Sequence, residues 1–155
     1  MKKGFVDDIE RLTLENSHFR RVLYTGANMQ LVLMTLGPGE EIGEEVHEDR
    51  DQFFRVEAGS GQVFIDGHAS DIHDDMAIIV PAGARHNVRN NGNEPLKVYT
   101  LYAPPEHKHG TVHVTKADAL RQEEHFDGTT SECSSCRRAS ALVTCTVPCW
   151  CSGGA

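Results

Sequence analysis

Four polar side chains in the middle of this chain have the types and spacing of a metal site: Glu45, His47, Gln52 and His86. Imidazole and carboxylate groups are ligands that first-row divalent ions such as iron, manganese, zinc and nickel prefer. Two histidines and one carboxylate can hold Fe(II) with positions left open, and the neutral amide oxygen of Gln52 would be a weaker fourth ligand. A bound ion would make a water more acidic or polarise a carbonyl group. We therefore predict one divalent transition metal ion at these residues.

The alternation of side chains along a β-strand predicts that the first three of these residues face inward. Glu45 and His47 are two residues apart, so they share one face of a strand. Gln52 shares its face with Phe54 and Val56, and these two apolar residues identify that face as the buried one. Gln52 is therefore predicted to lie inside the fold with Glu45 and His47.

The same alternation predicts the direction of the second segment. His86, Val88 and Asn90 share one face, and we expect this face to point inward as well. The geometry then brings two imidazoles, one carboxylate and one carboxamide to one point. The candidates for the wall of a substrate pocket beside this point are inward-facing residues, Phe54, Val88 and Tyr102.

Charged groups that could assist a reaction are harder to place from the sequence. A phosphorylated sugar would need an Arg or Lys beside the metal, and the residues predicted to point outward are Arg55, Arg85 and Arg89. Lys97 and Arg21 remain as candidates whose faces the alternation does not decide. Beyond Glu45, the pattern predicts no second inward carboxylate that could serve as a base.

The elements that must position these residues are short strands. Apolar and β-branched runs are separated by Gly, Pro and Asn turns at intervals typical of a sandwich or barrel, at residues 19–25, 29–36, 51–57, 62–66, 76–80, 85–89 and 96–102. The strands 51–57 and 62–66 are predicted to form a hairpin. Helical patterns are confined to a weak one at the N-terminus and a stretch at 116–124. This arrangement argues against an α/β fold.

Three regions are predicted along the chain: a leader at 1–17, a barrel at 18–128 and a tail at 129–155. All five cysteines lie in the tail, at positions 133, 136, 145, 149 and 151. The pair Cys133 and Cys136 with Cys149 and Cys151 could suggest a zinc site. The spacings match no zinc module, however, and the small polar composition favours an appended, poorly ordered extension.

The composition restricts the partners of the protein. Lys and Arg number 15 against 23 Asp and Glu, which gives a net charge of −8. Such a chain is not expected to bind nucleic acid through its charge, because phosphate binding needs a basic face. No apolar run has the ~18 residues of a membrane helix, and the N-terminus has no secretory signal pattern. We expect a cytoplasmic protein that contacts neither nucleic acid nor membrane.

A second group of histidines, His107, His109 and His113, lies within seven residues. Three imidazoles this close could form another metal site. A solvated surface loop is the interpretation we favour from the sequence.

The spacing of the two site segments resembles the conserved stretches of the cupin family. The first segment has Gly39, five residues, Glu45-Val46-His47, four residues, Gln52, six residues and Gly59. Cupins have Gly, five residues, His-x-His, three or four residues, Glu, six residues and Gly. The second segment, 81–90, reads PAGARHNVRN and matches the cupin pattern Pro-x-Gly, two residues, His, three residues, Asn. Two identities differ, because Glu45 replaces the first His and Gln52 replaces the Glu.

The resemblance implies an all-β fold, the cupin double-stranded β-helix or jelly-roll barrel, with a short leader and a C-terminal helix or tail. Cupins commonly pair through outer sheet surfaces, so the resemblance also implies a homodimer. The chain looks like small single-domain bacterial cupins often labelled mannose-6-phosphate isomerase-like. Cupin-type phosphomannose isomerases bind their metal through Gln, His, Glu and His, and this chain has the same four types with Gln and Glu exchanged.

Three functions remain open at this point, because a fold does not fix a function. The first is a metal-dependent enzyme that acts on a small polar metabolite, either a sugar-phosphate isomerase or an Fe(II)-dependent oxygenase. The second is a non-catalytic barrel that binds a small ligand. The third is a structural barrel with no ligand.

Overall fold

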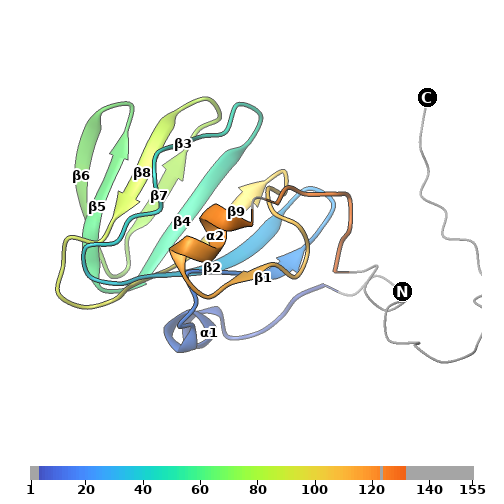
Figure 1. The fold of residues 1–155 in the computed structure, drawn as a ribbon, viewed down its shortest axis with the longest axis horizontal. Helices are drawn as coiled ribbons and strands as arrows, with labels where there is room; N and C mark the ends of the chain where they lie inside the picture. The colour runs from blue at the N-terminus through green and yellow to red at the C-terminus, as the bar shows by residue number, and fades with distance from the viewer. Residues whose placement is uncertain (1–3, 123, 132–155) are drawn as a thin grey trace, which may run out of the picture.

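Two antiparallel β-sheets packed face to face make up the computed structural model, which describes residues 4–122 and 124–131 (Figure 1). One sheet has the strand order β10-β1-β2-β9-β4-β7 and the other has the order β3-β8-β5-β6. The elements are α1 (Ile9–Glu15), β1 (Arg20–Thr25), β2 (Gln30–Leu36), β3 (Glu45–Val46), β4 (Asp51–Ala58), β5 (Ser60–Ile65), β6 (His68–His73), β7 (Ala77–Val80), β8 (Arg85–Arg89), β9 (Leu96–Ala103), β10 (Val112–His113) and α2 (Lys116–Arg121).

The hydrophobic core lies between the two sheets and follows from the alternation of side chains. On β2, Val32, Met34 and Leu36 point into it and are fully buried, and Phe54 and Val56 do the same on β4. Burying one such side chain contributes roughly 1.5–3 kcal/mol. The predicted all-β jelly-roll fold is confirmed.

The predicted hairpin between the fourth and fifth strands is wrong. β4 pairs with β7 and β9 in one sheet, whereas β5 pairs with β6 and β8 in the other. The chain therefore crosses between sheets at Gly59, where φ is +88° and an added Cβ would lie 2.5 Å from the carbonyl oxygen of Pro95. Two strands joined by a glycine-rich segment look like a hairpin in the local sequence. Their hydrogen-bond partners, however, are decided by strands elsewhere in the barrel.

Two strands, β6 and β10, were not predicted from the sequence. β10 has two residues, which is too short for a periodic signal. β6 has six residues, HASDIH, and all but Ile72 are exposed. β6 forms because it pairs with β5 at the edge of the sheet. It was not predicted because its polar composition has no alternating apolar pattern.

The N-terminal segment packs on the outer face of the six-stranded sheet. Asp8 caps α1, since its side chain accepts a hydrogen bond from the backbone N–H of Arg11. The end of the helix is tied to β2 by Asn16, whose amide nitrogen donates to Thr35 Oγ1 at 2.9 Å. Lys97 of β9 donates to the backbone oxygen of Asn16 at 3.0 Å. The weak helical pattern thus marked a real helix.

The C-terminal part of the described chain returns to the barrel. α2 begins with a capping box between Thr115 and Asp118. Further on, the backbone N–H of Ser131 donates to the Thr25 carbonyl at 2.8 Å, so residue 131 still contacts β1. The predicted zinc-like cysteine group lies outside the described residues. No helix within 4–122 or 124–131 has the length and apolar character needed to span a membrane.

Shortening the chain after residue 131 is expected to leave the thermal midpoint and the metal content unchanged. The core residues lie between Phe19 and Tyr102, and this cut also keeps the contact of Ser131 with Thr25. Thermal unfolding and elemental analysis of both lengths check the prediction. A clear loss of either property would show that residues 132–155 support the barrel.

Candidate metal centre

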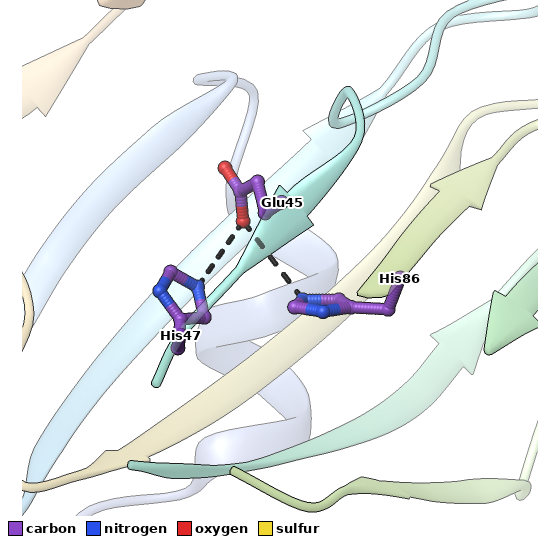
Figure 2. A group of neighbouring side chains, drawn as sticks. All are labelled: Glu45, His47 and His86. Atoms are coloured by element: carbon purple, nitrogen blue, oxygen red, sulfur yellow. Dashed lines mark ion pairs between the residues drawn. The ribbon is translucent and has the colours of Figure 1, made fainter. Parts of the chain in front are cut away.

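Three predicted ligands meet where β3 and β8 pair. Glu45 lies directly opposite His86 in the antiparallel register, and His47 follows just after β3. Glu45 Oε2 is 3.4 Å from His47 Nε2 and 4.0 Å from His86 Nε2 (Figure 2). One ligand atom from each residue lies within 4.8 Å of the other two. These separations allow one ion to contact all three atoms.

The fourth predicted ligand reaches the same point from the opposite sheet. Gln52 lies on β4 and is 1% exposed, and its Oε1 is 2.9 Å from His86 Nε2. The amide nitrogen of Gln52 donates to Thr100 Oγ1 at 3.1 Å, which turns the oxygen toward the histidine. All four predicted side chains therefore converge, as the alternation rule required.

The hydrogen-bond pattern of His86 suits a cation. Its Nδ1–H faces the carbonyl oxygen of Ala84 at 3.1 Å, so the neutral ring has a lone pair on Nε2. That lone pair faces the oxygen of Gln52, and two acceptors in contact are unfavourable unless a proton or metal ion lies between them. Burial lowers the pKa of His86, which disfavours the proton. If the Gln52 amide were reversed, its N–H would donate to His86 Nε2 and no ion would be needed. The orientation of the Gln52 amide therefore distinguishes a metal-free site from a metal-bound site.

Two further atoms at the site are buried without a hydrogen bond: Glu45 Oε2 and His47 Nε2. Burial raises the pKa of Glu45, but neighbouring His47 and Arg20 outweigh burial and lower it overall, so the carboxylate is ionised at neutral pH. Buried polar atoms normally have partners. A carboxylate oxygen and an imidazole nitrogen without hydrogen bonds, next to Nε2 of His86, fit a divalent transition metal ion.

The carboxylate of Glu106, which the sequence did not predict to point inward, lies beside Nδ1 of His47. Glu106 Oε2 is 3.6 Å from His47 Nδ1 and 2.6 Å from Arg50 Nη1. A carboxylate in this position favours the proton on Nδ1 and leaves Nε2 free for a metal. The expectation that Glu45 is the only inward carboxylate is therefore wrong. Glu106 lies in a loop after β9, where no alternation pattern predicts direction.

Replacing Glu106 by glutamine is expected to weaken metal binding by roughly tenfold or more, because carboxylates that pair with the second nitrogen of a ligating histidine typically contribute 10–100-fold. The change keeps the shape of the side chain and removes its charge. Isothermal titration with Zn²⁺ measures the affinity, and Glu94→Gln, an exposed glutamate, is the matched control. Equal affinity in Glu106→Gln and the parent protein would contradict the orienting role.

Arg20, which the sequence did not single out, is a buried cation beside the site, and Lys116 lines the same cavity. The Arg20 side chain is 10% exposed, and Nη2 is 3.7 Å from Glu45 Oε1. Of the two candidates named from the sequence, Arg21 is exposed and Lys97 is bonded to backbone oxygens near α1. Arg85 and Arg89 are exposed as predicted, and Arg55 is half-buried and pairs with Glu57 and Asp75.

A cavity of about 260 Å³ opens next to Glu45 and His47. Its wall combines apolar, basic and acidic side chains: Phe19, Arg20, Ile42, Glu106, His107, Lys116, Ala119, Leu120, Glu124 and His125. The pocket candidates Phe54, Val88 and Tyr102 lie in the core instead, each at most 1% exposed. Tyr102 still contacts the site, since its ring centroid is 5.7 Å from that of His47.

The expectation of a solvated histidine loop is wrong for two of its three members. His107 is 6% exposed and His113 is 2% exposed. Glu124 lies between them, with Oε1 at 3.2 Å from His107 Nδ1 and Oε2 at 3.3 Å from His113 Nε2. His109 is half-buried beside Thr25. The segment after α2 folds back over these rings, and this long-range contact is invisible in the local sequence.

Stability is expected to fall as the pH drops below about 6.5, the pKa of histidine in an unfolded chain. Burial lowers the pKa of His107 in the fold, against the opposing effect of Glu124. Below this pH the His107 imidazole therefore binds a proton more readily in the unfolded chain than in the folded chain, which lowers the free energy of unfolding. Above this pH the imidazole is neutral in both states, and the free energy of unfolding does not fall. Urea unfolding at pH 7.5 and 5.5 measures the fall in the free energy of unfolding between the two pH values. This fall should be smaller for His107→Gln than for His68→Gln, a control at an exposed histidine. Identical losses in both variants would contradict this assignment.

The fold and this site define a small β-barrel with a candidate metal centre at its mouth, and the comparisons identify the family. The Cupin_2 "Cupin domain" model matches residues 32–102. YrkC of Bacillus subtilis is 51% identical over 129 residues, covering 79% of this chain and 69% of that protein. The chain belongs to the cupin family.

Other relatives extend the comparison. The crystal structure of BH2720 from Bacillus halodurans is 49% identical, with a TM-score of 0.76, and the match covers 77% of this chain and 96% of that one. A mannose-1-phosphate guanylyltransferase of Escherichia coli is 34% identical over 71 residues, which is 46% of this chain and 15% of that protein. The first likeness covers the barrel, and the second covers only a small part of a much longer enzyme.

Proposed function

We propose that this cupin is a metal-dependent enzyme acting on a small polar metabolite. The observation that carries the proposal is the convergence of four ligand atoms from both sheets, two of them buried and otherwise unpaired. Glu45, His47, His86 and Gln52 would hold one divalent ion, iron, manganese, zinc or nickel. Such an ion would polarise a carbonyl group or a bound water.

Sugar-phosphate isomerisation is the reaction we place first. It requires a base that moves a proton between neighbouring carbons and a cation that binds the substrate. Arg20 supplies the cation, and His107 lines the cavity with Nδ1 at 3.2 Å from Glu124 Oε1 and Nε2 without a hydrogen bond. Because burial lowers the pKa of His107, its imidazole is neutral and can accept a proton. The partial likeness to a mannose-1-phosphate guanylyltransferase also supports a sugar-phosphate substrate.

An Fe(II)-dependent oxygenase is the second candidate. Two histidines and one carboxylate are the ligand set of many non-haem iron oxygenases, and the set occurs here as His47, His86 and Glu45. A neutral fourth ligand such as Gln52 would leave one or two positions for substrate. A non-catalytic ligand-binding barrel remains the third candidate and would need the same cavity.

Metal identity and two assays separate these candidates. Protein purified without a metal-affinity tag is analysed for its elements, then loaded with each divalent ion. Interconversion of mannose 6-phosphate and fructose 6-phosphate, lost in His107→Gln, is the result expected for the isomerase. Oxygen uptake with Fe(II) alone would select the oxygenase. Absence of bound metal under every loading condition would overturn the proposal of a metal enzyme.

A homodimer is also part of the proposal. On the outer face of the six-stranded sheet, Phe53 packs against Tyr99 with ring centroids 6.1 Å apart. Opposite Phe53 in the register lies Ile79 of the edge strand β7, which is 69% exposed. This apolar group supports pairing of two barrels, and sedimentation velocity measures it. A single monomeric species at micromolar concentration would contradict the dimer.

A further inference from the structure

The guanidinium group of Arg20 is buried without a full set of partners. Among residues 4–122 and 124–131 it forms no hydrogen bond, and its Nε is completely enclosed. The nearest carboxylate oxygen, Glu45 Oε1, is 3.7 Å from Nη2, which is beyond hydrogen-bond distance. The buried Nε has no acceptor, and the ion pair with Glu45 leaves the other donors of this charge without a hydrogen bond, which is unfavourable. An acceptor that enters the cavity would remove this penalty.

The strand register fixes Arg20 at the cavity wall. On β1 it lies opposite Met34 of β2 and His113 of β10, so both neighbouring strands hold its backbone. Its guanidinium carbon is 5.7 Å from the centroid of the Phe19 ring. The group is thus held in place beside Glu45, and it needs no loop movement to meet a ligand.

The other walls of the cavity restrict the charge and size of that ligand. Phe19, Ile42 and Ala119 form an apolar side. The charged side chains of the wall are three carboxylates and two cations: Glu45, Glu106, Glu124, Arg20 and Lys116. The volume of about 260 Å³ is below the ~300–1,000 Å³ typical of drug-sized ligands. Because the three carboxylates outnumber the two cations, a small molecule with one negative charge and an apolar part fits this combination better than a doubly charged phosphate.

We propose that the cavity binds a small monocarboxylate whose two oxygens are held by Arg20. A planar carboxylate matches the fork of guanidinium donors, and such paired hydrogen bonds are the strong ones. The apolar part of the molecule packs against Phe19 and Ile42. The inference rests on the proposed metal enzyme in placing the ligand beside the metal site, and it names a carboxylate, in place of the sugar phosphate considered there, as the anion that Arg20 holds. The Arg20 contact itself needs no metal.

Binding of butanoate to the full chain tests the proposal. Chemical-shift titrations follow the amide signals of the protein after EDTA treatment, and again after loading with Zn²⁺. Butanamide has the same shape without the charge, and inorganic phosphate represents the other class of anion. Arg20→Gln removes the guanidinium, Arg20→Lys keeps the charge without the fork, and Arg21→Gln is the matched control on the exposed face of the same strand.

In the EDTA-treated protein, butanoate should bind more tightly than butanamide and phosphate. Arg20→Gln should weaken butanoate binding by about tenfold to a hundredfold, since hydrogen bonds to charged groups are the ones lost. Arg20→Lys should fall between, and Arg21→Gln should match the parent. Tighter binding of phosphate, no binding of butanoate, or equal losses in Arg20→Gln and Arg21→Gln would overturn the proposal. Elemental analysis of the same samples tests the metal separately, so either idea can fail alone.

Discussion

A variant in which His47 and His86 are both alanine is expected to bind no divalent metal. The change removes both imidazole ligands and leaves one carboxylate and one neutral amide, a set too weak to hold a transition metal ion. The loss should exceed the 10–100-fold effect expected from removing a residue such as Glu106, which contacts a ligating histidine and not the metal. Elemental analysis after loading and dialysis measures the metal content. Full occupancy in the double variant would show that the ion, if present, is bound elsewhere.

The same variant should remain folded. Neither histidine belongs to the cluster of apolar side chains between the sheets, so the strands keep their main source of stability. His68 and His73 are exposed histidines on β6, and a variant with both changed to alanine is the matched control for two lost imidazoles. Circular dichroism and thermal unfolding separate loss of metal from loss of structure. An unfolded His47→Ala, His86→Ala protein would mean that these residues act mainly in packing.

Gly59→Ala is expected to destabilise the barrel by about 3–5 kcal/mol, in the upper range for single substitutions. The residue has a φ of +88°, and an added Cβ would lie 2.5 Å from Pro95 O and 3.0 Å from Leu96 Cα. Both contacts are with backbone atoms of the segment that enters β9, so neither can move aside without displacing a central strand. Urea unfolding of the parent and the variant measures the difference.

Gly67→Ala separates the two causes of this penalty. Gly67 has a similar φ of +80°, but an added Cβ would meet no atom within 4 Å. It should lose only about 1–2 kcal/mol, the cost of left-handed backbone for a residue with a side chain. Equal losses at both glycines would show that the close approach of β9 to Gly59 has little energetic weight.

The inward direction of Gln52 and His86 was predictable because it depends on a local rule. Side chains alternate along a strand, so apolar neighbours such as Phe54 and Val88 identify the buried face. Both polar residues are at most 2% exposed, as this rule requires. The cupin fold was predicted from the spacing of residues in the segments 39–59 and 81–90. A chain with the same spacing needs the same turns and therefore forms the same barrel.

The pairing of strands could not be predicted from the local sequence. The residues around Gly59 have the local appearance of a hairpin, yet the strands on either side belong to different sheets. β6 was missed because a polar strand at an edge has no alternating pattern. In both cases the partner strand, and not the local composition, decides the structure.

The sequence by itself therefore determined the family of the fold and the four converging side chains, because both follow from spacing and from alternation within single strands. Only the tertiary structure decided the surroundings of those side chains. Arg20 is 25 residues from Glu45 in the chain, and Glu106 and Glu124 are 20 and 38 residues from His86, the nearest of the four to each. Their charges act on the site through space, and the distances that set such interactions exist only after the strands have packed.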